Sequence, residues 1–190
     1  QLLFCDTGCG YEGYWGDFCR NIVIGGKSTD EQKKVHQAVL DCRNALLDSI
    51  RPGINTKELF NIGFKVLDKH DLGPSLSFFA HGIGLSSHEK PNVTAFDEQI
   101  LEEGMVLSME PNTEVQGMTM FNLEHSVVVT KDGYEDFSSL PFDLDALAIK
   151  ASVYLNLKNR EKVIECCNKI KELDPKNKSL IEIEDELKKI

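Results

Sequence analysis

Two histidines in a glycine-rich segment are the first residues of this chain that could do chemistry. His81 and His88 bound the segment HGIGLSSH, which continues as EKP to residue 91. Gly82 and Gly84 remove side chains beside the first histidine, so that backbone or a ligand can approach it closely. A neutral imidazole is the commonest side-chain metal ligand. Alone, the segment fits a metal site and a packing histidine followed by a surface histidine equally well.

Four carboxylates lie on both sides of this segment. Asp6 and Asp17, eleven residues apart, border a stretch of glycine and aromatic residues that predicts a β-hairpin and would bring them side by side. Glu110 and Glu124 each lie at the edge of an apolar, strand-like run. Together with His81 they form a hard, oxygen-rich set suited to two divalent first-row metals. Without metal, these anions would repel one another and be driven to take up protons.

The order and motifs of these residues resemble a known family. The motifs are Asp-x-Gly, Gly-Tyr-x-x-Asp, His-Gly-x-Gly, His-Glu-x-Pro, Gly-Met-x-x-x-x-Glu-Pro and Glu-His. Over residues 1–140 the chain is similar to the pita-bread metallopeptidases, which include methionine aminopeptidase, aminopeptidase P, prolidase and creatinase. A single acid is best interpreted as a solvated surface charge, but five residues agreeing in order and spacing favour a site.

The resemblance implies that five residues hold two divalent ions (Mn, Co, Zn or Fe): Asp6, Asp17, His81, Glu110 and Glu124. Asp17 and Glu124 would bridge the ions, which would deprotonate a bridging water to give a nucleophile at neutral pH. Glu110 would carry the proton to the leaving amine. His88 would donate to the scissile carbonyl as it becomes tetrahedral.

Residues that differ between branches of the family favour the Xaa-Pro group. Methionine aminopeptidases usually have an aromatic residue before the second histidine, where this chain has Ser87. The Asp-x-x-Arg signature of the Xaa-Pro group matches Asp17 and Arg20, and we expect Arg20 to pair with an acid near the site. Against this, prolidase-type members often have arginine where this chain has Asn122. We expect an Xaa-Pro aminopeptidase or dipeptidase acting on peptide substrates, with methionine aminopeptidase and creatinase-like amidohydrolase as variants.

A non-catalytic protein-interaction module on the same scaffold is the alternative from another class. Pseudo-enzymes of this fold generally lose metal ligands, and this chain keeps all five. His36 and His70 are expected to be surface or packing residues, and His125 to face away from the neighbouring ligand in a strand. A nucleophilic cysteine is not expected, because none has a cationic partner evident in the sequence.

The elements that must position these residues predict an α+β fold, the C-terminal part of a pita-bread fold with a curved antiparallel sheet and flanking helices. Residues 2–14 and 15–24 predict a hairpin, and 29–50 an amphipathic helix. A second helix over 56–70 would begin with Thr56 as its cap and bury a face made of Leu59, Phe60, Phe64 and Leu67. The chain begins five residues before Asp6, so we expect the N-terminal helices and strand of this fold, including a further histidine of the family, to be missing.

Residues 141–190 predict a second domain, a helical tail after a catalytic domain over 1–140. Seven positions over 144–177 match a tetratricopeptide repeat: Leu147, Ala151, Tyr154, Val163, Cys167, Ile170 and Pro175. A generic helical hairpin followed by a charged helix, 177–190, is the alternative. Because a lone repeat cannot bury its apolar face, we expect the tail to pack on the catalytic part, on a second copy as a homodimer, or on a protein partner.

Composition narrows the class of protein. The net charge of −10 falls entirely within residues 1–140, because residues 141–190 hold ten acidic and ten basic residues, so no nucleic-acid partner is expected. The sequence contains no run of about eighteen apolar residues, so it predicts no membrane-spanning helix. The six cysteines lack metal-knuckle spacing and are expected to be reduced thiols in the cytoplasm.

Overall fold

The computed structural model describes residues 1–24, 27–137, 150–151, 154–155, 157–173, 175–176 and 178–189. The chain divides into two compact units. The larger comprises Phe4–Asn21 and Lys34–Ser138, and the smaller comprises Gln1–Leu3, Ile22–Lys33 and Ser139–Ile190. All of the proposed metal ligands lie in the larger unit. Within the described residues, no helix has the length and apolar content needed to cross a membrane.

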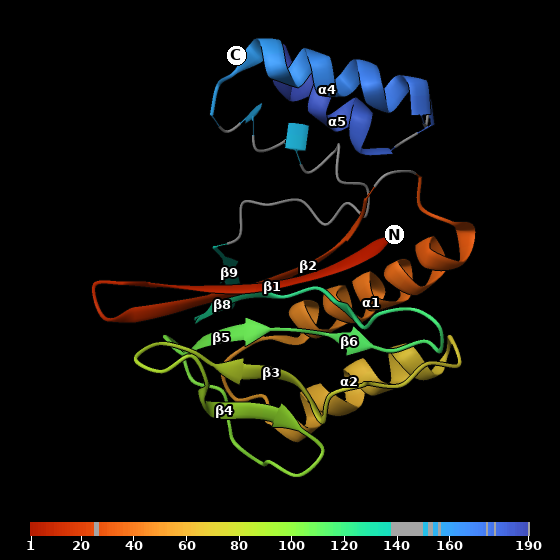
Figure 1. Ribbon diagram of the computed structural model, residues 1–190. Coiled ribbons are helices and arrows are strands. Elements are labelled where there is room, and N and C mark those ends of the chain that lie inside the picture. Colours follow the sequence, from red (N-terminus) through yellow and green to blue (C-terminus); the bar gives the residue numbers. More distant parts are fainter. Residues whose placement is uncertain are drawn as a thin grey trace. The chain divides into compact units, whose positions relative to one another are not determined.

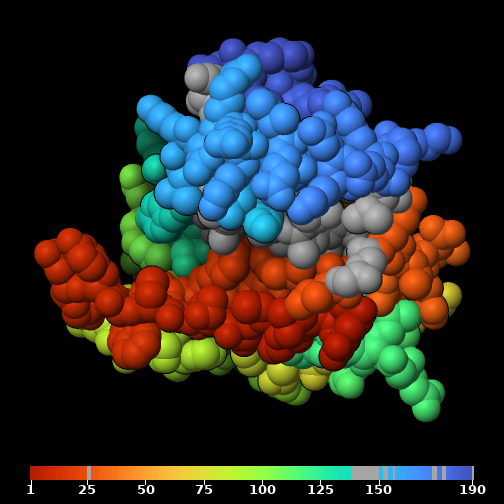
Figure 2. Space-filling model, turned by 45° about the horizontal axis from the view of Figure 1, so that its top comes forward, coloured from red at the N-terminus to blue at the C-terminus, as the bar shows by residue number. Residues whose placement is uncertain are grey.

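The expected hairpin is formed by β1 (Leu2–Tyr11) and β2 (Tyr14–Val23). Its turn lies at Glu12 and Gly13, earlier than the sequence pattern predicted, so the boundary expected between residues 14 and 15 is wrong. Both turn residues have positive φ, 50° and 89°, which a two-residue turn between twisted strands requires and which glycine adopts readily. The tip of this hairpin projects at the left of both views of the molecule (Figures 1 and 2).

An antiparallel sheet forms the centre of the larger unit. Its five strands among the described residues, in the order β4-β3-β5-β8-β9, are β4 (Glu89–Thr94), β3 (Phe78–Gly82), β5 (Val106–Met109), β8 (His125–Thr130) and β9 (Gly133–Asp136). A short separate ladder pairs β6 (Asn112–Thr113) with β7 (Phe121–Asn122). The antiparallel sheet and α+β class expected from the sequence are therefore confirmed.

Two helices run along this sheet (Figure 1), α1 (Asp30–Ser49) and α2 (Thr56–Asp68). At the start of α1, Thr29 and Gln32 form a reciprocal capping box, in which each side chain accepts from the other residue's backbone N–H. The cap of α2 was misassigned from the sequence. Asn55, not Thr56, accepts from the backbone N–H of Lys57 at 2.9 Å. The Thr56 hydroxyl instead donates to the Asp97 carbonyl.

The core lies between the helices and the sheet and includes Leu46 of α1, Leu59 of α2 and Leu107 of β5. Phe64, expected on the buried face of α2, is 43% exposed. Gly63 takes that position, because a Cβ there would come within 2.9 Å of the Phe79 ring. The flat surface left by this glycine lets the sheet approach the helix closely.

The tail contains α4 (Arg160–Leu173) and α5 (Lys178–Leu187), in agreement with the helices expected there. Part of the first helix expected in the tail lies outside the described residues. Leu147 also lies outside them. Tyr154 was expected to find no burial inside the tail. That was wrong, because it packs on the tail's own cluster with Leu155 and Leu187. That cluster consists of Ala151, Val163, Cys166, Cys167, Ile170, Leu180 and Ile183.

Candidate metal centre

The register of the sheet brings together three of the expected ligands. β5 and β8 are antiparallel with Met109 opposite His125, so Glu110, one residue after β5, faces Glu124, one residue before β8. On the other side of β5, Ser108 pairs with His81 of β3. Ligand atoms of His81, Glu110 and Glu124 lie within 4.8 Å of one another, and all three residues are buried.

The His81 ring presents a lone pair to the two carboxylates. Its Nδ1 lies 3.0 Å from the Gly82 carbonyl oxygen, which accepts only if Nδ1 carries a proton. In the neutral ring, Nε2 is then an acceptor, 3.4 Å from Oε1 of Glu110 and 3.6 Å from Oε1 of Glu124. This buried nitrogen has no hydrogen-bond partner among the described residues. With both carboxylates ionised, the three facing atoms are all acceptors, and such a group fits a bound cation.

The hairpin supplies the two aspartates. Asp6 on β1 and Asp17 on β2 come together with Glu124, their ligand atoms again within 4.8 Å of one another. The side chain of Asp17 accepts from the Phe18 backbone N–H at 3.0 Å. Reciprocal backbone hydrogen bonds between Cys19 and Glu124 tie β2 to the start of β8. Residues far apart in sequence therefore converge because two strands meet here.

Two carboxylates are shared between neighbouring groups of ligand atoms. Glu124 belongs both to the group with His81 and Glu110 and to the group with Asp6 and Asp17. Asp17 also forms a third group with the two histidines of the glycine-rich segment. Glu124 and Asp17 are the two residues for which the family resemblance implied bridging roles.

His88 lies at the rim of this cluster. It is exposed, and its ring stacks on that of His81 with centroids 3.8 Å apart. The loop that carries it is held by Glu89, which accepts from the Ser86 backbone N–H, and by the backbone bond from Trp15 to Gly84. One nitrogen of His88 lies close enough to ligand atoms of Asp17 and His81 for the three to be able to hold a metal ion.

The electrostatics of the cluster favour a cation. Burial, and after it the charge of Glu124, raises the pKa of Glu110 to about 8. Burial also raises the pKa of Glu124, and burial followed by the charge of Asp17 raises that of Asp6. Each of these three carboxylates therefore resists ionisation beside its neighbours, and a bound divalent ion would remove this penalty. The donor set, rich in oxygen with one imidazole, suits Mn, Co, Fe or Zn.

Three side chains to which the sequence analysis gave no role at the site donate hydrogen bonds to expected ligands. The Ser108 hydroxyl donates to Oε1 of Glu124 at 3.0 Å, and Asn122 Nδ2 donates to Oε2 of Glu110 at 3.0 Å. Asn112 Nδ2 donates to the Glu110 carbonyl at 2.8 Å. Because side chains alternate between the two faces of a strand, the sequence pattern of the strand next to His81 could have identified Ser108. The two asparagines could not be identified in this way, because their positions depend on the pairing of β6 with β7.

The Arg20 side chain contacts the backbone carbonyl of Glu124, a proposed ligand residue. Its guanidinium donates to the carbonyls of Cys19 and Glu124, and burial lowers its pKa to about 10. His125 is fully buried beside Asp136, with Nε2 3.5 Å from Oδ2, and burial lowers its pKa to about 3. This agrees with the structural role expected for His125. Arg43 forms a 2.8 Å ion pair with the same aspartate.

The remaining histidines lie outside the cluster, as expected. His36 is buried in α1, whereas His70 lies beyond the end of α2, is exposed and is 3.8 Å from the Asp41 carboxylate. All six cysteines are free thiols in the structure. Burial raises the pKa of Cys19 well above its usual range, so it is not an activated nucleophile.

Comparison with known proteins decides the family. The model of metallopeptidase family M24 matches residues 1–131. The chain belongs to this family. Its resemblance to the pita-bread metallopeptidases is thereby confirmed.

Relatives of the M24 chain include the Xaa-Pro dipeptidase of Pyrococcus horikoshii, 33% identical over 134 residues that cover 70% of this chain and 38% of that protein. The X-Pro aminopeptidase of Thermotoga maritima is structurally similar, with a TM-score of 0.70, 29% identity and coverage of 75% of this chain and 40% of that one. The prolidase of P. horikoshii has a TM-score of 0.69 at 32% identity, covering 75% and 41%. The M24 chain thus has the pita-bread fold over about three quarters of its length and spans about two fifths of the length of these proteins.

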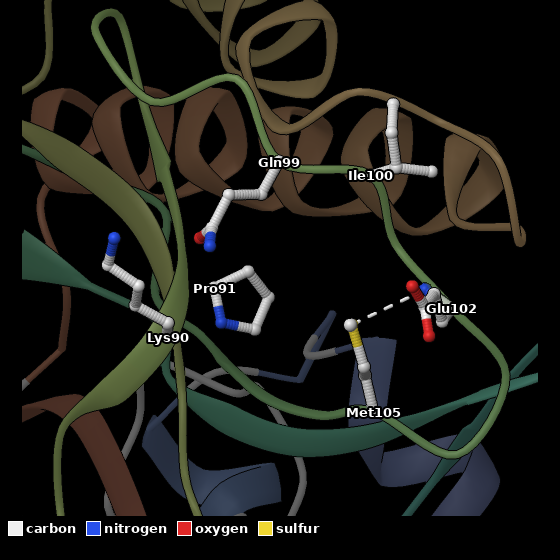
Figure 3. Close-up of a pocket in the computed structure, with 6 residues that line it drawn as sticks. All are labelled: Lys90, Pro91, Gln99, Ile100, Glu102 and Met105. Atoms are coloured by element: carbon white, nitrogen blue, oxygen red, sulfur yellow. Dashed lines mark hydrogen bonds between the residues drawn. The ribbon is translucent and has the colours of Figure 1, made fainter.

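A separate cavity of about 320 Å³ lies beside β4 in the M24 chain (Figure 3). Its lining residues are Lys90, Pro91, Gln99, Ile100, Glu102 and Met105. None of these lining residues belongs to the groups of candidate metal ligands. The cavity is therefore not part of the metal centre.

Proposed function

We propose that the M24 chain holds the dinuclear metal centre of a peptidase that removes N-terminal residues from Xaa-Pro peptides, as an aminopeptidase or dipeptidase. Its ligands would be Asp6, Asp17, His81, Glu110 and Glu124. The observation that supports this most is the buried Nε2 of His81, which faces two carboxylate oxygens at 3.4 and 3.6 Å and has no hydrogen-bond partner among the described residues. The names of its relatives, Xaa-Pro dipeptidase and X-Pro aminopeptidase, favour the substrate class.

The proposed assignment divides the ligands between two ions. His81 and Glu110 would complete one ion, Asp6 would bind the other, and Asp17 and Glu124 would bind both. The bound ions would lower the pKa of a water held between them and so supply a nucleophile at neutral pH.

Residues of this chain would handle the proton and the developing charge. Burial raises the pKa of Glu110 to about 8 in the metal-free chain, and its Oε1 faces the interior of the cluster. Glu110 would accept the proton of the nucleophile and pass it to the leaving amine. His88, exposed at the rim, would donate to the scissile carbonyl oxygen as negative charge develops there.

Further features of the proposal concern the whole protein. We propose Mn, Co, Zn or Fe as the ions, a cytoplasmic location, and a homodimer or protein contact through the helical tail. The tail's exposed Ile164 and Ile181, 41% and 66% accessible, support a contact through this part of the chain.

Metal analysis and hydrolysis assays test this function together. The purified chain, dialysed against metal-free buffer and titrated with Mn²⁺ or Co²⁺, should bind two ions and gain thermal stability. Release of the first residue should then be measured with Ala-Pro, Ala-Pro-Ala and Met-Ala peptides. Faster cleavage of the proline peptides supports the Xaa-Pro assignment, and faster cleavage of Met-Ala supports a methionine aminopeptidase. Two bound ions without cleavage of any peptide would favour a non-catalytic module, and no bound ion would contradict the proposed centre.

A further inference from the structure

The two oxygens of the Glu110 carboxylate have different partners. Oε1 faces His81 Nε2 at 3.4 Å, inside the ligand cluster. Oε2 accepts a hydrogen bond from Nδ2 of Asn122 at 3.0 Å, and both side chains of that bond are buried. One oxygen is thus left for a metal ion, while the other is already held by the protein.

Asn122 is itself held in place through its backbone. It lies on β7 opposite Asn112 of β6, and its backbone N–H donates to Oδ1 of Asn21 at 2.7 Å. Asn21 in turn donates to the Met120 carbonyl at 2.7 Å. These bonds hold the backbone of Asn122 and leave its side-chain amide available to donate to Glu110.

Packing alone does not explain an asparagine at this position. The residue is 1% exposed, and its Oδ1 has no hydrogen-bond partner among the described residues. A buried carbonyl left without a donor destabilises the folded state, and an apolar side chain of similar size would avoid that penalty. Such a replacement would, however, remove the hydrogen bond that the Asn122 amide donates to Glu110.

We propose that Asn122 is a positioning residue that restricts Glu110 to binding its metal ion through Oε1 alone. This inference rests on the proposed metal centre. By holding Oε2, Asn122 fixes the rotation of the carboxylate and directs Oε1 toward His81. Without that hydrogen bond, the carboxylate is free to rotate and to offer both oxygens, which changes the coordination number of the ion or weakens its binding.

Ser108 provides a matched comparison within the same sheet. Its hydroxyl donates to Oε1 of Glu124 at 3.0 Å and is fully buried. Glu124 is shared by both proposed ion positions, whereas Glu110 belongs to one. Loss of the Ser108 donor should therefore weaken both ions, and loss of the Asn122 donor should weaken the ion on His81 and leave the other unchanged.

Calorimetric titration with Co²⁺ tests this difference. Asn122→Leu removes the amide at nearly constant volume and should weaken one of the two binding steps by about 10- to 100-fold, the usual effect of removing such a supporting partner. Ser108→Ala should weaken both steps. The visible absorption of the bound Co²⁺ should also change in Asn122→Leu, because the coordination number of one ion changes. Thermal unfolding of the metal-free variant should occur at the wild-type temperature or above it.

Several outcomes would overturn the inference. If Asn122→Leu binds Co²⁺ in two steps with wild-type affinities and gives an unchanged Co²⁺ spectrum, the amide does not position Glu110. Equal weakening of both steps in Asn122→Leu would show a general structural role instead. If the leucine variant does not fold, Asn122→Ala removes the same donor without added apolar bulk and is judged by the same criteria. A wild-type chain that binds no Co²⁺ would contradict the proposed metal centre itself, which separates that failure from failure of the inference.

Discussion

Glu110 and Glu124 lie opposite each other because one follows β5 and the other precedes β8, and the two strands are antiparallel with Met109 paired to His125. Two buried carboxylates at adjacent positions would normally be unfavourable. Here the imidazole of His81 and the hairpin aspartates complete a set of oxygen and nitrogen donors around them. This relationship places Glu124 at the centre of the proposed ligand set.

Replacement of Glu124 should remove both proposed ions. Glu124→Gln keeps the shape of the side chain but removes the charge shared by the two groups of ligand atoms. We expect bound metal to fall from two equivalents to none at micromolar Co²⁺, measured by elemental analysis after gel filtration. Asp6→Asn, which alters one group, should retain one ion. Retention of two ions in Glu124→Gln would contradict the shared position.

The stability of the metal-free chain should fall as the pH rises from 6.5 to 8. The pKa of Glu110 is raised from 4.5 to about 8, so the folded state binds a proton that the unfolded state has released, and stability decreases with pH. Burial lowers the pKa of His81, but Glu124, the Gly82 carbonyl and Glu110 together raise it above its usual value, which acts in the same direction. Below pH 6.5 the lowered pKa of His125, about 3, acts in the opposite direction, because the unfolded state takes up that proton.

Urea denaturation in EDTA at pH 6.5, 7.2 and 8.0 checks this dependence. Glu110→Gln serves as the control, because its amide does not titrate and the decline should become shallower. Added Co²⁺ should abolish the decline, since the ion takes the place of the protons. A free energy of unfolding that rises with pH in EDTA would contradict the assigned shifts.

Glu110 and His88 should differ in their effects on turnover. Glu110→Gln should abolish hydrolysis, because the group that transfers the proton is lost. His88→Ala should lower the rate by about 10²- to 10³-fold, by analogy with removal of one oxyanion donor, while both ions stay bound. Peptide hydrolysis and elemental analysis on the same samples separate the two effects. Loss of metal in His88→Ala would show that His88 is a ligand, a role that its proximity to Asp17 and His81 also permits.

An alanine at Gly82 should destabilise the fold beside His81. A Cβ at this position would lie 2.4 Å from the Lys90 carbonyl oxygen and 2.6 Å from its carbon, so the backbones of β3 and β4 must separate. We expect a loss of about 1–3 kcal/mol in the free energy of unfolding, as for other overpacked sites. Gly73→Ala is the matched control, because nothing lies within 4 Å of its Cβ. Equal stability of the two variants would contradict the close approach.

The tail should respond to a charge at Tyr154. This side chain packs on the apolar cluster of the tail, and Lys162 Nζ lies 4.9 Å from its ring centroid. Tyr154→Asp should lower the stability of the tail or dissociate an oligomer while the metal content stays unchanged. Limited proteolysis and light scattering provide the measurements. Rapid cleavage of the wild-type chain near residue 141, leaving a stable monomeric core, would show that the tail is an independent appendage.

The sequence by itself determined the class of fold, the family and the set of residues that could bind metal. Local patterns were sufficient for the approximate bounds of α1 and α2, because helix periodicity depends on neighbours within a few residues. Similarly, the motifs around Asp6, Asp17 and His81 indicated a shared site because their order and types agreed. Whether these residues bind metal stays a prediction.

Only the tertiary structure decided which of these side chains touch, and what supports them. Ser108 contacts Glu124 across 16 residues of sequence, and Arg20 contacts it across 104, because strand register brings them together. The burial of Gly63 in place of Phe64 depends on the Phe79 ring, which belongs to another element. Likewise, Asn122 could be recognised as the partner of Glu110 only once β6 and β7 were paired. Contacts of this kind depend on how distant strands align, which no local pattern of residue types encodes.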